Sequence, residues 1–281
     1  MIDHSGFVTI VGRPNVGKST LLNEIVGQKI SIVSAMPNTT RSRVRGIVNR
    51  GNTQMVMVDT PGLHRPKSLL GEKMNAAASD SINEVDLVLV VIDAHAGLGK
   101  GDDMILSSSP KESFVVINKC DAVRPAEIAK VLAQIGSYDK AEYFPISART
   151  GDGIGELVDA MFAKMPEGPE MFPSNMLSDT PKQLWVADLV REQLLKVAKE
   201  ELPHSIATVV SEWDPPLIRV EILVERESQK PIVIGKGGAV LKEVGTRVRQ
   251  QLPKGTRIEL FVKVDKNWQG SERALTRLGL W

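Results

Sequence analysis

A phosphate-binding pattern occupies eight consecutive residues near the N-terminus. It matches G-x-x-x-x-G-K-[ST] at every fixed position and consists of Gly12, Arg13, Pro14, Asn15, Val16, Gly17, Lys18 and Ser19. In such a loop the glycines let backbone N–H groups surround a phosphate, the lysine reaches the outer phosphates and the hydroxyl ligates Mg²⁺. Residues 7–11 form an apolar run before the loop, and residues 20–26 have the character of a helix. This context predicts a nucleotide site, with Thr20 as a further contact.

A second group of candidate residues ends a later strand-like run. Asp59, Thr60 and Gly62 follow residues 53–58, which are mostly apolar. A carboxylate in this place can hold Mg²⁺ through water, and a glycine N–H can meet a γ-phosphate. We therefore expect Ser19 and Asp59 at the metal, and Thr60 and Gly62 beside the phosphates.

Two further segments indicate which base is bound. Asn118, Lys119 and Asp121 end one strand-like run, and Ser147 and Ala148 end another. The Asp121 carboxylate can accept two hydrogen bonds from guanine N1–H and its exocyclic amine, a donor pair that adenine lacks. Lys119 can lie along the base, Asn118 can brace the loops, and the Ala148 N–H suits guanine O6. The set predicts GTP and GDP as ligands rather than ATP.

The elements that must position these residues alternate between strand and helix. Strand-like runs span residues 44–49, 53–58, 86–93, 113–118 and 142–146, and several contain a continuous apolar stretch. Short apolar strands separated by helices indicate a parallel-rich sheet with helices on both faces. Open α/β sheets bind ligands at the carboxyl ends of their strands, where these motifs fall. The first half is therefore predicted to be an α/β P-loop GTPase domain.

Proline and glycine mark a change of character after residue 165. We predict a GTPase domain over residues 1–167, a linker over 168–178 and a second domain over 179–281. In the second domain a helix is expected at 181–201, strands at 205–213 and 217–224, and a short helix at 229–234. A helix at 239–251, a strand at 257–264 and a last helix at 271–278 follow.

A glycine-rich loop in the second domain fits the G-x-x-G clamp of a KH domain. The order of helix, two strands, short helix, G-x-x-G, helix and strand is that of an α+β type II KH domain, and such a loop holds about four nucleotides. Residues 226–281 contain 12 Lys and Arg against 5 Asp and Glu. A basic tail favours a polyanion partner. The expected RNA contacts are Ile234, Gly235, Lys236, Gly237, Gly238, Lys242, Arg226 and Lys230.

The bulk composition sets the expected compartment. The chain has 281 residues, a formal net charge of +1 and one cysteine, so it forms no intrachain disulfide. A reducing compartment fits this, and no apolar run approaches about 18 residues. We expect a cytoplasmic protein and favour a monomer. Peripheral contact with the inner face of the plasma membrane is left open, because the sequence is silent on it.

Several stretches resemble the translation-factor-related GTPases and, within them, the Era family. They are residues 12–23, 37–41, 59–64, 224–238 and 262–268, so the resemblance extends over nearly the whole chain. It implies that Thr40, rather than Thr39, ligates Mg²⁺. It also implies single-stranded RNA near the 3′ end of 16S ribosomal RNA as partner, and a role in assembly of the 30S subunit.

The residues leave open which group assists hydrolysis. Leu63 follows Gly62, where Ras-like enzymes have a glutamine that orients water. We expect slow hydrolysis in isolation, with Lys18, Asn15 and Thr40 as the catalytic set. In related GTPases an asparagine at the place of Asn15 helps to hold K⁺, so K⁺ is a further candidate cofactor.

Alternative functions remain at this point. The leading hypothesis is a GTP-hydrolysing switch in which residues 34–46 and 60–75 respond to nucleotide and change RNA affinity. The chain could instead be an RNA-binding assembly protein that uses GTP as a structural ligand, which Leu63 slightly favours. A P-loop kinase or ATPase is opposed by Asp121, and another GTPase of ribosome or tRNA maturation is a weaker alternative.

Overall fold

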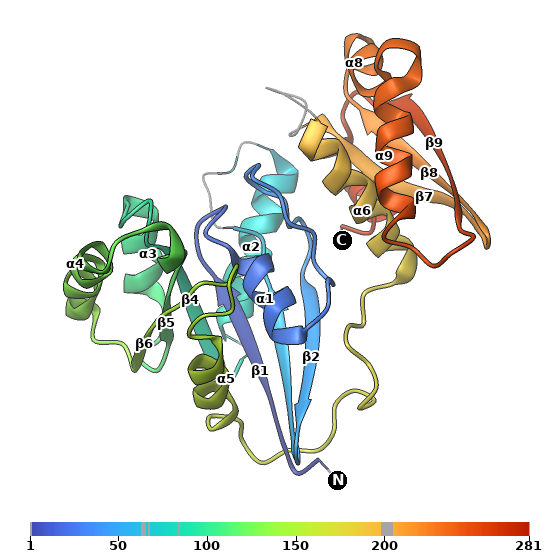
Figure 1. The fold of residues 1–281 in the computed structure, drawn as a ribbon. Coiled ribbons are helices and arrows are strands. Elements are labelled where there is room, and N and C mark those ends of the chain that lie inside the picture. Colours follow the sequence, from blue (N-terminus) through green and yellow to red (C-terminus); the bar gives the residue numbers. More distant parts are fainter. Residues whose placement is uncertain (1, 63–65, 67, 84, 198–204, 281) are drawn as a thin grey trace. The chain divides into compact units, whose positions relative to one another are not determined.

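The computed structural model describes residues 2–62, 66, 68–83, 85–197 and 205–280 (Figure 1). Contacts divide the chain into two compact units. The first comprises Met1–Ser31, Thr40–Lys67 and Gly71–Asp179. The second comprises Ile32–Thr39, Ser68–Leu70 and Thr180–Trp281. The segment before Thr40 is therefore counted with the C-terminal half of the chain.

The first unit is built on a six-stranded sheet with the order β2-β3-β1-β4-β5-β6. Only the pairing of β2 with β3 is antiparallel among these strands. The strands are β1 (His4–Val11), β2 (Val44–Arg50), β3 (Thr53–Asp59), β4 (Leu87–Asp93), β5 (Phe114–Asn118) and β6 (Glu142–Pro145). The helices are α1 (Lys18–Val26), α2 (Leu69–Asn83), α3 (Lys100–Ser108), α4 (Pro125–Ile135) and α5 (Ile154–Phe162), with short 3₁₀ turns η1 (Cys120–Ala122) and η2 (Gly136–Tyr138). The predicted fold class is confirmed.

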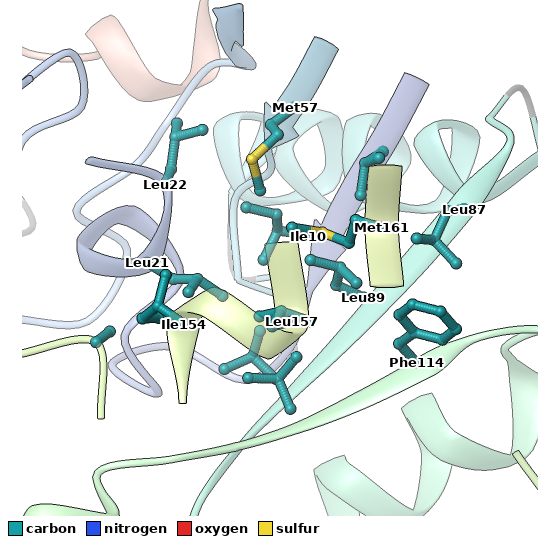
Figure 2. Close-up of a cluster of buried hydrophobic side chains, with 14 of the residues drawn as sticks. Ile10, Leu21, Leu22, Met57, Leu87, Leu89, Phe114, Ile154, Leu157 and Met161 are labelled. Atoms are coloured by element: carbon teal, nitrogen blue, oxygen red, sulfur yellow. The ribbon is translucent and has the colours of Figure 1, made fainter. Parts of the chain in front are cut away.

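Strand β4 explains why both faces of the sheet are covered. Its seven residues are all buried. Leu87 and Leu89 belong to the cluster that includes Leu157 of α5, whereas Val88 and Val90 belong to the cluster that includes Ile105 of α3. Figure 2 shows the first cluster between the sheet and helices α1 and α5. Because residues 87–92 are apolar on both faces of the strand, helices are required on each side of the sheet, as the sequence pattern predicts.

The segment predicted to be a linker lies along the edge of this sheet. The backbone N–H of Ile47, in edge strand β2, donates to the Leu177 carbonyl at 2.9 Å. Gln54 is fully buried, and its Oε1 accepts from the N–H groups of Met171 and Phe172, each at 2.9 Å. Its Nε2 donates to the Phe172 carbonyl at 2.7 Å. Residues 168–178 therefore form a bound strap, and the division at 168–178 remains a prediction.

The second unit contains a three-stranded sheet with the order β7-β8-β9. Strands β7 (Ala207–Asp214) and β8 (Leu217–Val224) are antiparallel, and β9 (Arg257–Val264) is parallel to β8. Its helices are α6 (Lys182–Val197), α8 (Lys230–Ile234), α9 (Ala239–Arg249) and α10 (Glu272–Arg277), with 3₁₀ turns η3 (Glu227–Gln229), η4 (Lys236–Gly238) and η5 (Trp268–Gly270). The type II KH order is confirmed. The predicted end of the first helix, residues 198–201, lies outside the described residues.

Apolar faces of α6, α8 and α9 form the core of this unit with β8. Leu189 and Val190 of α6 lie with Val220 and Ile222 of β8 in one buried cluster, to which Val244 of α9 also belongs.

Within the described ranges, no helix combines the length and apolar character needed to cross a membrane.

Candidate functional site

The phosphate loop connects β1 to α1 and closes around the Lys18 ammonium. Lys18 Nζ donates to the carbonyls of Gly12 and Arg13, both at 3.1 Å. Gly17 caps α1 with a φ of 103°, a left-handed conformation that favours glycine. A Cβ at Gly17 would lie 2.2 Å from Asn118 Nδ2. Glycine at this position leaves room for the Asn118 side-chain amide beside the loop.

Lys18 and Asp59 form a buried pair of opposite charge. Lys18 is 6% exposed and Asp59 is fully buried. Burial lowers the pKa of Lys18 to about 8, an effect that the charge of Asp59 partly offsets. Burial likewise raises the pKa of Asp59 above its ordinary value. Anionic phosphate oxygens beside Lys18 would favour its charged form.

Three hydroxyl groups converge on one oxygen of Asp59. Its Oδ2 accepts from Ser19 Oγ at 2.6 Å, from Ser31 Oγ at 3.0 Å and from Thr40 Oγ1 at 3.2 Å. Its Oδ1 is buried and has no hydrogen-bond partner among the described residues. Thr39, by contrast, donates to the Met36 carbonyl at 2.7 Å. Hydroxyls beside an unsatisfied carboxylate oxygen make a donor set that suits a hard cation such as Mg²⁺.

The five expected residues around the base lie together, because they stand at or just after the ends of adjacent strands β5 and β6. Asn118 Nδ2 donates to the Val16 carbonyl at 2.8 Å, and Asn118 Oδ1 accepts the Ala148 N–H at 2.9 Å. That N–H, expected to meet guanine O6, binds Asn118 in the structure. Lys119 Nζ donates to the Asn15 carbonyl at 2.7 Å. The loops are thus braced as predicted from the sequence.

Asp121 carries the charge that would read guanine. Its Oδ1 accepts from Ser147 Oγ at 2.6 Å, and its Oδ2 accepts from the Arg149 guanidinium. The Ser147 hydrogen bond is the main cause that lowers the pKa of Asp121, and the charge of Arg149 adds to it. The carboxylate is therefore ionised and already bound to donors of the type that guanine offers.

The remaining loop residues have distinct positions. Thr60 Oγ1 donates to the Ile10 carbonyl at 2.8 Å. A Cβ at Gly62 would lie 2.8 Å from Pro14 N, so this segment contacts the phosphate loop. Asn15 is exposed with a φ of 65°, and Thr20 is half-buried. Leu63 lies outside the described residues.

Sequence reasoning missed three side chains that contact the expected metal-binding and base-binding residues. They are Ser31 at Asp59, Arg149 at Asp121, and Asp93, whose Oδ2 lies 2.6 Å from Lys119 Nζ. None has a fixed spacing from the motif that it serves. Only Asp93 had a signal in the sequence: it is a polar residue at the carboxyl end of a strand, where open α/β sheets bind ligands.

The G-x-x-G loop of the second unit presents backbone and charge to solvent. Gly235, Gly237 and Gly238 have φ values of 75°, 60° and 80°. A Cβ at Gly235 would lie 2.6 Å from Val240 Cγ2. Lys236, Lys242 and Arg226 are exposed, Ile234 is half-buried, and Lys230 Nζ lies 3.3 Å from Glu227 Oε2. Trp268, which could have stacked on a base, is fully buried and donates to the Ser205 carbonyl.

Comparisons with known proteins agree with this geometry. Residues 7–119 match the family model described as 50S ribosome-binding GTPase, and residues 201–269 match the KH domain model. GTPase Era of Mycobacterium avium (strain 104) is 45% identical over 98% of this chain and 98% of its own length. The chain belongs to the GTPase Era family. Its reaction is therefore the hydrolysis of GTP to GDP and phosphate, and the prediction of a GTPase is confirmed.

Two solved structures of the GTPase Era family share the complete fold. One is Era of Aquifex aeolicus in a variant form bound to GDP and AlF₄⁻, with a TM-score of 0.92 and 39% identity. The other is Era in complex with MgGDPNP and nucleotides 1506–1542 of 16S ribosomal RNA, with a TM-score of 0.93 and 39% identity. Each covers 99% of both chains. Family membership confirms the resemblance inferred from the motifs.

Proposed function

We propose that this GTPase is a switch that binds single-stranded RNA, near the 3′ end of 16S ribosomal RNA, during assembly of the 30S subunit. The observation that carries the proposal is the exposed G-x-x-G loop in a KH fold on the same chain as a guanine-reading carboxylate. The Era structure with a 16S fragment supports the choice of RNA. Family membership also favours hydrolysis over a structural role for GTP.

The nucleotide-binding roles follow from the geometry of the loop and its neighbours. Backbone N–H groups of residues 12–20, except Pro14, would surround the phosphates, with Thr60 and Gly62 beside them. Asp121 would bind the guanine edge, while Asn118, Lys119, Ser147 and Ala148 hold the pocket. Lys18 would neutralise charge that develops on the transferred phosphoryl group.

Magnesium is the metal that the donor set at Asp59 suits. Ser19 and Thr40 would ligate it directly and Asp59 through water, in an arrangement where the ion also needs phosphate oxygens. When bound, it supplies positive charge at the β- and γ-phosphates. Within the described residues no cluster of three or more His, Cys, Asp or Glu could hold a metal by itself. This fits an ion that binds together with its nucleotide.

A change at Asp121 tests the nucleotide assignment. Asn at this position offers an amide N–H, which matches the carbonyl that xanthine carries in place of the guanine amine. Asp121→Asn should therefore lose GTP affinity by at least about tenfold and gain affinity for xanthosine triphosphate. Calorimetry with both nucleotides measures this, and Asp139→Asn is the control, because Asp139 pairs with Lys111 at the surface. Unchanged preference in Asp121→Asn would remove Asp121 from the pocket.

A charge reversal in the G-x-x-G loop tests the RNA assignment. Lys236→Glu should weaken binding of a single-stranded 16S 3′ fragment by about tenfold or more, because like charges then face each other. Lys254→Glu makes the same charge change beyond the far end of α9, a helix of 11 residues, and should have the smaller effect. Equal losses in a fluorescence anisotropy titration would indicate only a diffuse basic face.

The finer assignments belong to the same proposal. Asn15 would help to hold K⁺, and its left-handed backbone, tied through its carbonyl to Lys119, supports a fixed side-chain direction. Slow hydrolysis without a partner, a cytoplasmic location and a monomeric state are proposed with it. Peripheral contact with the inner face of the plasma membrane is proposed from the basic excess of residues 226–281.

A further inference from the structure

The side chain of Arg13 connects the phosphate loop to the N-terminus of α3. Its Nη2 lies 2.7 Å from Asp102 Oδ2 and donates to the Gly97 carbonyl at 3.1 Å. The Asp102 side chain is 1% exposed and that of Arg13 is 30% exposed. A charge-assisted hydrogen bond to a carboxylate that is shielded from water is among the stronger kinds in proteins.

Two glycines make room for this arginine. A Cβ at Gly101 would lie 2.9 Å from Arg13 Cδ, and one at Gly99 would lie 3.2 Å from Arg13 Nη1. Gly101 is the second residue of α3, where glycine is a poor helix former compared with alanine. The close approach of the Arg13 stem gives a physical reason for glycine at this position.

The backbone of Arg13 and its neighbour contacts the phosphate-binding groups. The Arg13 carbonyl accepts a hydrogen bond from Lys18 Nζ at 3.1 Å. The next residue, Pro14, lies so close to Gly62 that a Cβ there would come within 2.8 Å of Pro14 N. Movement of Arg13 would therefore displace both the Lys18 ammonium and the contact with Gly62.

We propose that Asp102 is a positioning residue for GTP binding. Through its ion pair with Arg13, whose side chain occupies the space left by Gly99 and Gly101, it holds the phosphate loop in the shape that binds nucleotide. The proposal rests on the proposed phosphate-binding role of the loop. Asp102 would act on the nucleotide indirectly, through the side chain of Arg13.

Asp102 also has a local role that must be separated from this one. Its Oδ2 accepts the Gly99 N–H at 2.9 Å and so caps α3. Asn in its place keeps an oxygen for the cap but removes the charge from Arg13. Asp102→Asn therefore weakens the link to the loop while α3 retains its cap.

The test compares Asp102→Asn with Asp103→Asn in the full chain. Asp103 is the next residue of α3, and its carboxylate accepts from Tyr138 at the surface. Calorimetry and the GDP dissociation rate should show about tenfold weaker binding for Asp102→Asn and little change for Asp103→Asn. The preference for GTP over ATP should stay unchanged in both, because the base pocket is intact. Equal affinities for the two variants, at equal thermal midpoints without nucleotide, would overturn the proposal.

A second variant keeps every charge in place. Gly101→Ala should displace the Arg13 stem and weaken GDP binding by several-fold, although alanine favours the helix. Gly155→Ala is the matched control, because Gly155 is the second residue of α5 and nothing lies within 4 Å of its added Cβ. Wild-type affinity in Gly101→Ala would contradict the claim that the space at Gly101 is needed to place the Arg13 side chain.

Lys18→Ala separates the role of Asp102 from the proposed phosphate-binding role of the loop. If Lys18→Ala binds GTP like the wild type, the loop is not the phosphate site and both proposals fail. If Lys18→Ala loses binding while Asp102→Asn and Gly101→Ala keep it, only the role of Asp102 fails.

Discussion

At the scale of single residues, the Lys18 side chain lies where burial disfavours its charged form. It is buried, and two backbone carbonyls and the charge of Asp59 stabilise it. Burial nevertheless lowers the pKa of Lys18 to about 8, within reach of neutral pH. A nucleotide that brings phosphate charge to this ammonium must therefore complete its protonation.

Proton uptake on GDP binding should follow from this pKa. A lysine with a pKa of about 8 that becomes fully charged takes up about 0.1 proton at pH 7 and about 0.75 proton at pH 8.5. GDP affinity should accordingly fall as pH rises through 8, because binding then has to supply the missing proton. Calorimetry at each pH in buffers of different ionisation enthalpy, with EDTA to exclude metal binding, measures the uptake. Absence of proton uptake at pH 8.5 would mean that Lys18 keeps the ordinary, higher pKa of a lysine.

Residues within fixed motifs were predictable, and residues that serve them from elsewhere were not. The sequence identified Asn118 and Asp121 because their spacing is set by one turn after a strand. It missed Ser31 and Asp102, which reach the site only through tertiary packing. A serine before a loop and an aspartate in a first helical turn each have ordinary local explanations.

At the scale of elements, the strap formed by residues 168–178 shows how an edge strand can be covered without another strand. Backbone groups of β2 would otherwise be free to pair with a second chain. Four hydrogen bonds from the single side chain of Gln54, including one to Asn49 at 3.0 Å, hold the strap and the hairpin together.

Replacing Gln54 should loosen the strap and lower stability. Gln54→Met keeps the length of the side chain but leaves the N–H groups of Met171 and Phe172 without their acceptor. The free energy of unfolding should fall by about 1–3 kcal/mol, and proteolysis within residues 168–178 should become faster. Urea unfolding and limited proteolysis measure the two effects. Gln134→Met, at an exposed position of α4, should change neither, and equal behaviour of both variants would refute the role of Gln54.

The elements themselves were largely predictable, whereas the strap was not. Apolar runs such as β4 allow few alternatives to a buried parallel strand. Proline and glycine around residues 166–169 indicate only that helix and strand stop. The sequence around a polar residue such as Gln54, the second residue of β3, does not indicate which segment its side chain will bind.

At the scale of the whole molecule, the boundary between the two compact units falls inside the expected switch segment, residues 34–46. Thr40 belongs to the first unit and Ile32–Thr39 to the second. Within the second unit the Val33 N–H donates to Glu192, a side chain of α6 that is 2% exposed. The residue proposed to ligate Mg²⁺ is thus joined directly to a segment that is counted with the KH half.

Nucleotide and RNA should consequently influence each other to the same extent. A saturating 16S 3′ fragment should change the affinity for a non-hydrolysable GTP analogue by about 5-fold or more, and the analogue should change RNA affinity by the same factor. Two reciprocal titrations measure the pair of ratios. Lys236→Glu, at RNA concentrations too low to saturate it, serves as the control. If both affinities are independent of the other ligand, the chain is a GTPase and an RNA-binding protein without a switch.

The contact between Arg149 and Asp121 has a consequence for how guanine nucleotides leave. The guanidinium gives the carboxylate a donor of the same kind as a purine edge would give. If Asp121 binds the base as proposed, an arriving base would replace a hydrogen bond from Arg149, and after the base leaves Arg149 would again pair with the Asp121 carboxylate. The contribution of Asp121 to affinity would then be the difference between two competing donors, which would limit how tightly GDP is retained.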